Sequence, residues 1–291
     1  MAFTMSEYTL YISLEQKQPL KLKSILSKLA DFLCNQSIRI VWLSVNQVLT
    51  AQKINSALKY EKQFKNNNIY ISHTIEVLNV ARIAPLASFV LYQYGFGLIL
   101  HASNYSDVRE TISKEIAIKK SLIHGYIVVD SYSESDYFQW LSNDDDFKIQ
   151  PFLDITKLCF DQEPIACKYN SCLAKSIYID ENCNLGFCPY IKNKIQLERI
   201  EKCDSFEQLF EGTGFIEILY KQIQKRNDCM QKCQQYNFCK GGCPLEDECE
   251  NCNIVEMIQK AELLELYDIK SNAAKNLYKE YMLSLANKFR V

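Results

Sequence analysis

A chain of 291 residues, 48% hydrophobic and 23% charged, is long enough to bury a substantial core and has the composition of a globular protein. The formal net charge of −2 at pH 7 and the lack of any Lys/Arg cluster argue against a nucleic-acid-binding surface. The first residues, MAFTMSEYTLYISLEQ, contain no basic segment followed by a long apolar one. We therefore expect no signal peptide and a cytoplasmic location.

The first half of the chain alternates between strand-like and helix-like segments. Runs of β-branched and aromatic residues predict strands at Glu7–Ser13, Ile38–Val45, Asn68–Ile75, Phe96–Ala102, Tyr126–Ser131 and Phe147–Leu153. Apolar residues at helical spacing predict helices at Leu20–Cys34, Thr50–Phe64, Val77–Tyr94, Asp107–Leu122 and Glu134–Leu141. Because parallel neighbours need crossover helices, this alternation implies a parallel sheet. Periodicity does not decide between an open barrel and a flat, doubly wound sheet.

One span within this half is long enough for a membrane helix: Ile83 to Ser106 contains no Asp, Glu, Lys or Arg. Pro85, Gly95 and Gly97 interrupt it. We therefore expect a buried helix, kinked at Pro85, then a turn and a strand, and no membrane segment.

The sequence pattern changes after about residue 155, where helical periodicity gives way to cysteines and short segments. Ser176–Asp180 and Leu185–Pro189 are typical of a hairpin, and the capping-box pattern Asp204–Glu207 predicts the start of a helix. From Asn253 onward an apolar stripe at helical spacing predicts a C-terminal helical segment that packs against the barrel.

Cysteines are concentrated in this second part. Of the 13 cysteines, Cys34 alone precedes residue 159, and the others lie between Cys159 and Cys252. Without a signal peptide a reducing compartment is expected, where clustered thiols usually bind a metal or a cluster.

The densest stretch is CMQKCQQYNFCKGGCP, residues 229 to 244. Its short gaps let several sulfurs converge on one ion or cluster, and the glycines before Cys243 permit close approach of the backbone. A structural zinc site, a disulfide knot and an iron–sulfur site are the three interpretations. The number of thiols and the lack of nearby histidine favour the iron–sulfur site.

The order of these cysteines resembles the SPASM domain of radical-SAM peptide- and protein-modifying enzymes. The resemblance rests on Cys167-x4-Cys172, on a hairpin ending in Gly-Phe-Cys188-Pro, and, after a gap of forty residues, on Cys229, Cys233, Cys239, Gly-Gly-Cys243-Pro and a final cysteine. It implies two auxiliary [4Fe–4S] clusters. By position, the first would be held by Cys167, Cys172, Cys188 and Cys243. The second would be held by Cys229, Cys233, Cys239 and Cys252, with Cys249 as the alternative last ligand.

Two departures from the family's pattern concern the second cluster and the SAM site. The Cys229–Cys233 gap is one residue longer than the family's usual pair. The first strand is followed by Glu15-Gln-Lys-Gln-Pro19, where radical-SAM enzymes have Cys-x3-Cys-x2-Cys, and the second ends in Ser44-Val-Asn-Gln, where they have Gly-Gly-Glu. The resemblance is therefore to a pseudo-radical-SAM protein that lacks the SAM cluster and is expected not to cleave SAM.

The resemblance implies three parts: a degenerate partial (β/α)6 barrel over 1–155, a SPASM-like iron–sulfur domain over 156–255 and a C-terminal helical segment over 256–291. The implied function is that of an accessory protein in maturation of a ribosomally synthesised peptide. It would bind the precursor peptide, dock a radical-SAM partner or relay electrons. A redox enzyme acting on a peptide and a zinc-stapled binding module are the alternatives.

The remaining cysteines and the histidines have simpler interpretations. Four cysteines are expected to be buried or free thiols rather than ligands: Cys34, Cys159, Cys183 and Cys203. His73 and His101 lie in or at the end of predicted strands and would share a barrel mouth, but a structural hydrogen bond is the expected role of each, as it is of His124. No catalytic residue is predicted.

Overall fold

The computed structural model describes residues 7–44, 47–64, 69–112, 118, 122, 125–142, 148–150, 152–153, 176–190, 196–232 and 236. The described strands are β1 (Glu7–Ser13), β2 (Ser37–Ser44), β3 (Tyr70–Val77), β4 (Gly97–Asn104), β5 (Tyr126–Ser131), β6 (Ile149–Gln150), β7 (Ser176–Ile179) and β8 (Leu185–Gly186). The helices are α1 (Pro19–Phe32), α2 (Ala51–Glu61), α3 (Pro85–Gln93), α4 (Tyr105–Ile112), α6 (Glu134–Ser142) and α8 (Thr213–Lys232), with 3₁₀ turns at Val80–Arg82, Ile200–Lys202 and Glu207–Phe210.

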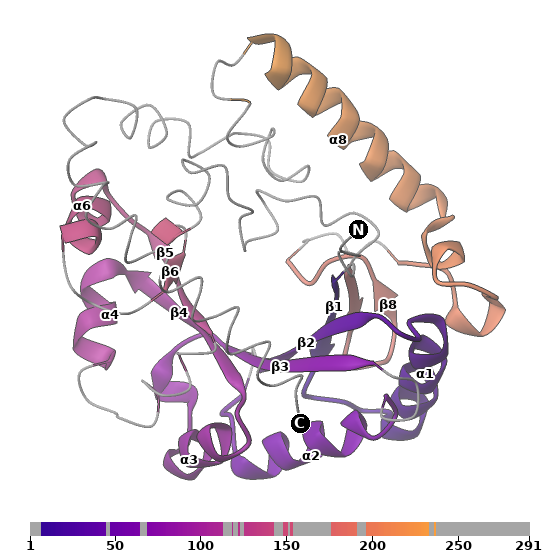
Figure 1. The fold of residues 1–291 in the computed structure, drawn as a ribbon, viewed down its shortest axis with the longest axis horizontal. Helices are drawn as coiled ribbons and strands as arrows, with labels where there is room; N and C mark the ends of the chain where they lie inside the picture. The colour runs from indigo at the N-terminus through magenta and orange to yellow at the C-terminus, as the bar shows by residue number, and fades with distance from the viewer. Residues whose placement is uncertain are drawn as a thin grey trace.

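All eight described strands form one sheet in the order β6-β5-β4-β3-β2-β1-β7-β8. Strands β1 to β6 are parallel to their neighbours and follow one another in chain order; β7 adds to the free edge of β1 in parallel, and β8 pairs antiparallel with β7. A doubly wound sheet has helices on both faces, whereas the described helices that connect β1 to β6 all lie on one side of this sheet (Figure 1). This arrangement favours the open, barrel-like alternative.

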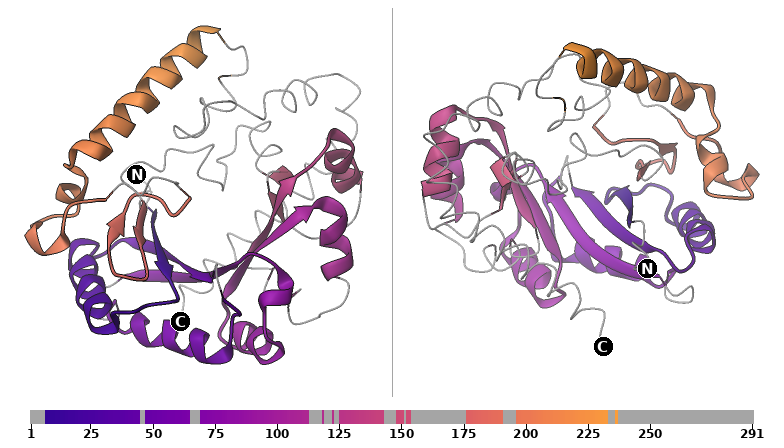
Figure 2. Two further views of the ribbon diagram at one scale, coloured as in Figure 1. Left: turned by 180° about the vertical axis from the view of Figure 1, so that it is seen from behind. Right: turned by 45° about the horizontal axis from the view of Figure 1, so that its top comes forward.

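The sheet is curved, with its helices on the outside (Figure 1). Helices α1 to α4 and α6 cover the convex side, whereas α8 lies across from the opposite face, here called the inner face (Figure 2). Leu10 and Ile12 of β1 are fully buried in the main core with Leu22 and Leu26 of α1. A second, small cluster consists of Val41, Leu43 and Ile99, against which Tyr11, Tyr126, Val128 and Tyr178 pack. Because side chains alternate along a strand, this cluster belongs to the inner face.

Most predicted elements are confirmed, and β1 and β5 have the predicted bounds. The region around Pro85 is the main correction. The predicted helix from Val77 to Tyr94 is wrong, because β3 continues to Val77 and α3 begins at Pro85. Proline is well suited to the first turn of a helix, where its missing N–H has no partner to lose. It therefore starts the helix and does not kink it.

Three other segments differ in detail. Strand β6 is confined to Ile149–Gln150, and Phe152 and Leu153 are helical. The Asp204 backbone N–H is capped by Gln208 Oε1 at 2.6 Å, not by Glu207, and the turn that follows is 3₁₀. The β7–β8 hairpin is confirmed. The predicted C-terminal helical segment lies outside the described residues. Within the described part, no helix is long and apolar enough to span a membrane.

Candidate functional site

The loop between β1 and α1 is tied to the β7–β8 turn. The Gln16 side-chain amide donates to Ser13 O at 2.7 Å and to Asp180 O at 3.0 Å, and Lys17 N donates to Glu181 O at 2.9 Å. Residues far apart in the chain thereby brace a short loop that contains no cysteine.

Cys183, in the β7–β8 turn, makes further contacts with the β1–α1 loop. It lies in the hairpin turn with a φ of 61°, a region that favours glycine, and it is 3% exposed. Its thiol donates to Gln16 Oε1 at 3.2 Å and to Gln18 O at 3.4 Å. Burial raises the pKa of the Cys183 thiol, which keeps it protonated as a donor. Cys183 therefore acts as a structural thiol at this loop.

A polar network lies on the inner face beyond the loop. Glu76 is paired in register with Leu43 and Ile99, both in the inner-face cluster, and His101 lies two residues beyond Ile99. Asp130 lies two residues beyond Val128, the register partner of His101. Period-two alternation therefore places Glu76, His101 and Asp130 on one face, near the carboxyl ends of three adjacent strands.

Hydrogen bonds join these residues into a chain. Glu76, only 3% exposed, accepts from Tyr190 Oη at 2.6 Å through one carboxylate oxygen and contacts His101 Nε2 at 2.9 Å through the other. His101 Nδ1 lies 3.5 Å from Asp130 Oδ1, and the Tyr11 and Tyr190 rings meet edge to face at 5.8 Å. We call Glu76, His101, Asp130 and Tyr190 the inner-face network. Both oxygens of its buried carboxylate have partners, as burial of a charge requires.

Burial and charge set the protonation of this network. Burial alone lowers the pKa of His101, but the hydrogen bonds and charges of Glu76 and Asp130 outweigh it, so the net pKa is raised. Tyr190 as a whole is 55% exposed, but its hydroxyl is buried against Glu76; this burial, and then the charge of Glu76, raise the pKa of Tyr190 well above its ordinary value. The network therefore keeps His101 charged to a higher pH than a free imidazole and favours a neutral Tyr190 phenol. It can hold and exchange a proton.

His73 is not part of this network, so the idea that His73 and His101 share a mouth is wrong. His73 accepts a hydrogen bond from Trp42 Nε1 at 3.2 Å and packs on Phe96 at 5.3 Å between ring centroids. Trp42 and Phe96 belong to the main core under the helices. Because His73 lies three residues before Glu76, alternation puts it on the opposite face of β3.

Of the eight predicted cluster ligands, the structure describes Cys188 and Cys229. Neither is in a disulfide. Phe187, next to Cys188, packs on Phe215 near the start of α8 at 5.4 Å, whereas Cys229 lies fourteen residues further along that helix. At 1.5 Å per residue this is roughly 21 Å. The structure therefore does not bring Cys188 and Cys229 together.

The other predicted ligands lie outside the described residues: Cys167, Cys172, Cys233, Cys239, Cys243 and Cys252, as does the alternative Cys249. Cys159 and His124 lie outside them as well. In the part that is described, no group of three or more His, Cys, Asp or Glu residues is arranged to hold a metal ion. Cys203 is a buried thiol that donates to Arg199 O at 3.4 Å, and Cys34 is exposed.

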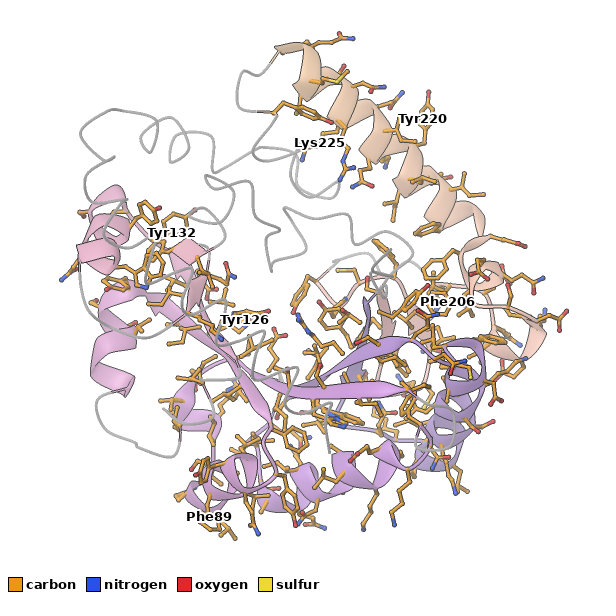
Figure 3. The ribbon with its side chains drawn as sticks, in the orientation of Figure 1. Phe89, Tyr126, Tyr132, Phe206, Tyr220 and Lys225 are labelled. Atoms are coloured by element: carbon orange, nitrogen blue, oxygen red, sulfur yellow. The ribbon has the colours of Figure 1, made fainter. Side chains whose placement is uncertain are left out.

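The face of α8 that carries Cys229 supplies polar donors. Gln222 is 3% exposed, and its Nε2 is buried without a hydrogen-bond partner among the described residues; the same holds for Nε of Arg226. Figure 3 shows Lys225 on the side of α8 that faces the rest of the molecule and Tyr220 on the opposite side. Buried donors of this kind call for an acceptor.

Comparison with known proteins identifies solved structures of similar fold. No family model matches the chain, and no curated protein matches it. Among solved structures it is similar to anSMEcpe with bound AdoMet and Cp18Cys peptide, with a TM-score of 0.63 and 14% identity over 93% of this chain and 99% of that one. It is also similar to anSMEcpe with AdoMet alone, with a TM-score of 0.61 and 14% identity over 92% and 99% of the two chains. anSMEcpe is a radical-SAM/SPASM sulfatase maturase. At this identity the likeness concerns the fold, and the chain has a radical-SAM-like α/β fold with a mostly parallel eight-stranded sheet.

Proposed function

We propose that this chain is an iron–sulfur protein of peptide maturation that does not cleave SAM itself. It would combine a degenerate barrel over 1–155, a SPASM-like cluster domain over 156–255 and a helical segment over 256–291. Two [4Fe–4S] clusters would be its cofactors. Its partners would be a precursor peptide and a radical-SAM maturase or redox protein.

The observation that carries the proposal is the β1–α1 loop. Three thiolates are needed at this place to hold a cluster with an open iron for SAM, and Glu15-Gln-Lys-Gln-Pro19 supplies none. Gln16 instead bonds to Asp180 O and receives the Cys183 thiol. The β1–α1 loop thus makes structural contacts with the β7–β8 hairpin. These contacts support the proposal that the chain lacks SAM chemistry but keeps its cysteine-rich region.

The inner face supports a role in peptide binding. A structural neighbour holds a peptide together with AdoMet, and here Tyr11, Tyr126 and Tyr190 expose part of their rings beside the inner-face network. Aromatic rings and a carboxylate–imidazole network supply apolar contact and hydrogen bonds to a peptide chain. Asp130, with a side chain 62% exposed, leaves a carboxylate open to a cationic or amide group.

The cluster assignment is tested by metal analysis of matched variants. Anaerobically purified protein should contain about eight irons with matching sulfide if two [4Fe–4S] clusters are present. Cys188→Ala should lose about four of them. Cys183→Ala, in the same hairpin but bonded to Gln16, should lose none. Zinc without sulfide, or equal losses in both variants, would contradict the assignment.

The SAM prediction needs a separate assay. The reduced protein, incubated with SAM, should release no 5′-deoxyadenosine, and a radical-SAM maturase run alongside is the positive control. Cleavage dependent on this chain alone would refute the proposed pseudoenzyme.

The inner-face network also favours a second candidate, a peptide-modifying enzyme. His101 between Glu76 and Asp130 is a ready acid–base group. Turnover of a candidate peptide by this chain alone, lost in His101→Gln, would favour the enzyme over the accessory protein.

A further inference from the structure

Carboxylates gather at one edge of the sheet. The carboxyl ends of β1, β3, β5 and β7 each hold or are followed by at least one of them: Glu15, Glu76, Asp130 and the pair Asp180 and Glu181. Because these strands belong to one parallel array, their carboxyl ends lie at the same edge. In barrel folds this edge is where ligands bind.

Three of these carboxylates are engaged in contacts that hold the fold. Asp180 accepts hydrogen bonds within the β7–β8 turn, at 2.8 to 3.0 Å from its donors. Glu76 has a partner on each oxygen, and Glu181 Oε1 lies 3.9 Å from Lys17 Nζ. The fold therefore accounts for Glu76, Asp180 and Glu181 without a ligand.

Glu15 is different, because its Oε1 is buried and has no hydrogen-bond partner among the described residues. Lys53 is close enough for the Glu15 charge to act on it. However, Lys53 Nζ donates to Val48 O at 3.0 Å, and no ion pair joins it to Glu15 in the described part of the chain. A buried acceptor without a donor is costly. A ligand that brings a hydrogen-bond donor to Glu15 removes that cost.

Asp130 is the second carboxylate that can take a ligand. Its side chain is 62% exposed, and its one polar contact within the described residues is that of Oδ1 with His101 Nδ1, at 3.5 Å. Tyrosine rings lie between the two carboxylates: Tyr11 and Tyr126 pack on the inner-face cluster, and Tyr11 meets Tyr190 edge to face at 5.8 Å. The faces of tyrosine rings attract cations.

The electrostatic environment of Tyr178 on β7 shows that negative charge accumulates at this edge. Burial, and then the charges of Asp180, Glu181 and Glu15, raise the pKa of Tyr178 to about 12. Carboxylates along a face of low polarity focus a negative potential, which draws cations to it. The charge at this edge therefore complements a basic ligand and repels an acidic one.

We propose that the inner face binds a basic peptide, with one lysine or arginine side chain on Glu15 and a second on Asp130. The inference rests on the proposed function, since it takes the ligand to be a peptide, and it names the class of that peptide. From β1 to β5 the sheet spans four strand spacings, or about 19 Å. An extended peptide advances about 3.3 Å per residue, so basic residues about five or six positions apart fit both carboxylates.

The test measures peptide binding by the full chain, purified anaerobically. The probes are fluorescein-labelled, end-blocked Gly/Ser peptides of equal length that carry two lysines, two norleucines or two glutamates, about five residues apart. Fluorescence anisotropy at low ionic strength gives each affinity. The lysine peptide should bind at least about tenfold more tightly than the norleucine peptide, and the glutamate peptide should bind most weakly.

Variants locate the binding site. Glu15→Gln should weaken binding of the lysine peptide at least about tenfold, because a buried charge-assisted bond is lost. Asp130→Asn should weaken it about threefold, because this carboxylate is exposed. Glu217→Gln, at an exposed position of α8, is the control and should not change it. Asp130→Lys should shift the preference toward the glutamate peptide, a gain that an unfolded variant would not show.

The outcomes separate this inference from the proposed function. Equal affinity for the three peptides, or no binding of any of them, with normal iron and sulfide overturns this inference and leaves the proposed function standing. An effect of Glu217→Gln as large as that of Glu15→Gln overturns it as well. Charge-selective binding by a wild type without iron and sulfide supports the basic-peptide site and overturns the cluster assignment.

Discussion

The hydrogen bond between Tyr190 and Glu76 joins the segment after Cys188 to the middle of the sheet, and its removal tests that link. Tyr190→Phe deletes the hydroxyl that donates to Glu76 Oε2 at 2.6 Å. Hydrogen bonds to charged groups contribute roughly 1.5 to 3 kcal/mol. Tyr190 as a whole is 55% exposed, but its hydroxyl and Glu76 are buried, so water has little access to the bond and we expect at least the lower end of this range, about 1.5 kcal/mol.

A double-mutant cycle with Glu76→Met isolates this bond from the packing of the ring. Stability is measured by urea unfolding, with the fluorescence of buried Trp42 as a probe of the sheet. The coupling between Tyr190→Phe and Glu76→Met should be about 1.5 kcal/mol. Tyr220→Phe, at a tyrosine 62% exposed on α8, is the control. A coupling below about 0.5 kcal/mol would refute the view that this contact stabilises the fold.

Three further predictions concern the same sheet. The pKa of His101 is raised in the folded state. Protonated His101 therefore contributes its full stabilisation below the unfolded pKa of about 6.5, and this stabilisation is lost as pH rises through the folded pKa. The urea midpoints of wild type and His101→Gln should differ most at acidic pH and converge at alkaline pH. Gly125→Ala places a Cβ 1.8 Å from Leu98 O and should cost about 1 to 3 kcal/mol or more in thermal unfolding, whereas Gly212→Ala, with 3.7 Å to the nearest atom, should be nearly neutral. Asn104→Ala removes the cap that accepts from Asp107 N at 3.0 Å and should lower stability by about 1 kcal/mol, and Asn104→Ser should restore most of it.

Much of the barrel half follows from local sequence. The β1 run EYTLYIS and the β5 run YIVVDS are dense in β-branched and aromatic residues and are flanked by polar ones, so local signals and the fold agree. The prediction of one helix from Val77 to Tyr94 was wrong because the sequences of a strand end, a 3₁₀ turn and a helix together resemble one apolar helix. The joining of β7 to β1 depends on contacts across more than 160 residues, which no local pattern contains.

The inner-face network was only partly visible in the sequence. His101 stood out as a rare residue type, but its partners did not. Glu76 and Tyr190 are 114 residues apart, and neither belongs to a recognisable motif. The available signal was Glu76 itself, a single acid in the alternating strand YISHTIEV, since a charge at a buried strand position requires partners.

Because β7 pairs in parallel with β1, the cysteine-rich second half of the chain supplies the strand that covers the β1 edge of the sheet. Thr9 to Ile12 pair with Ser176 to Ile179 along that edge. A chain cut near residue 155 would present the β1 edge to solvent with unpaired backbone groups, a form prone to pairing with other chains. The part of the chain before residue 155 is thus not a module to be expressed alone.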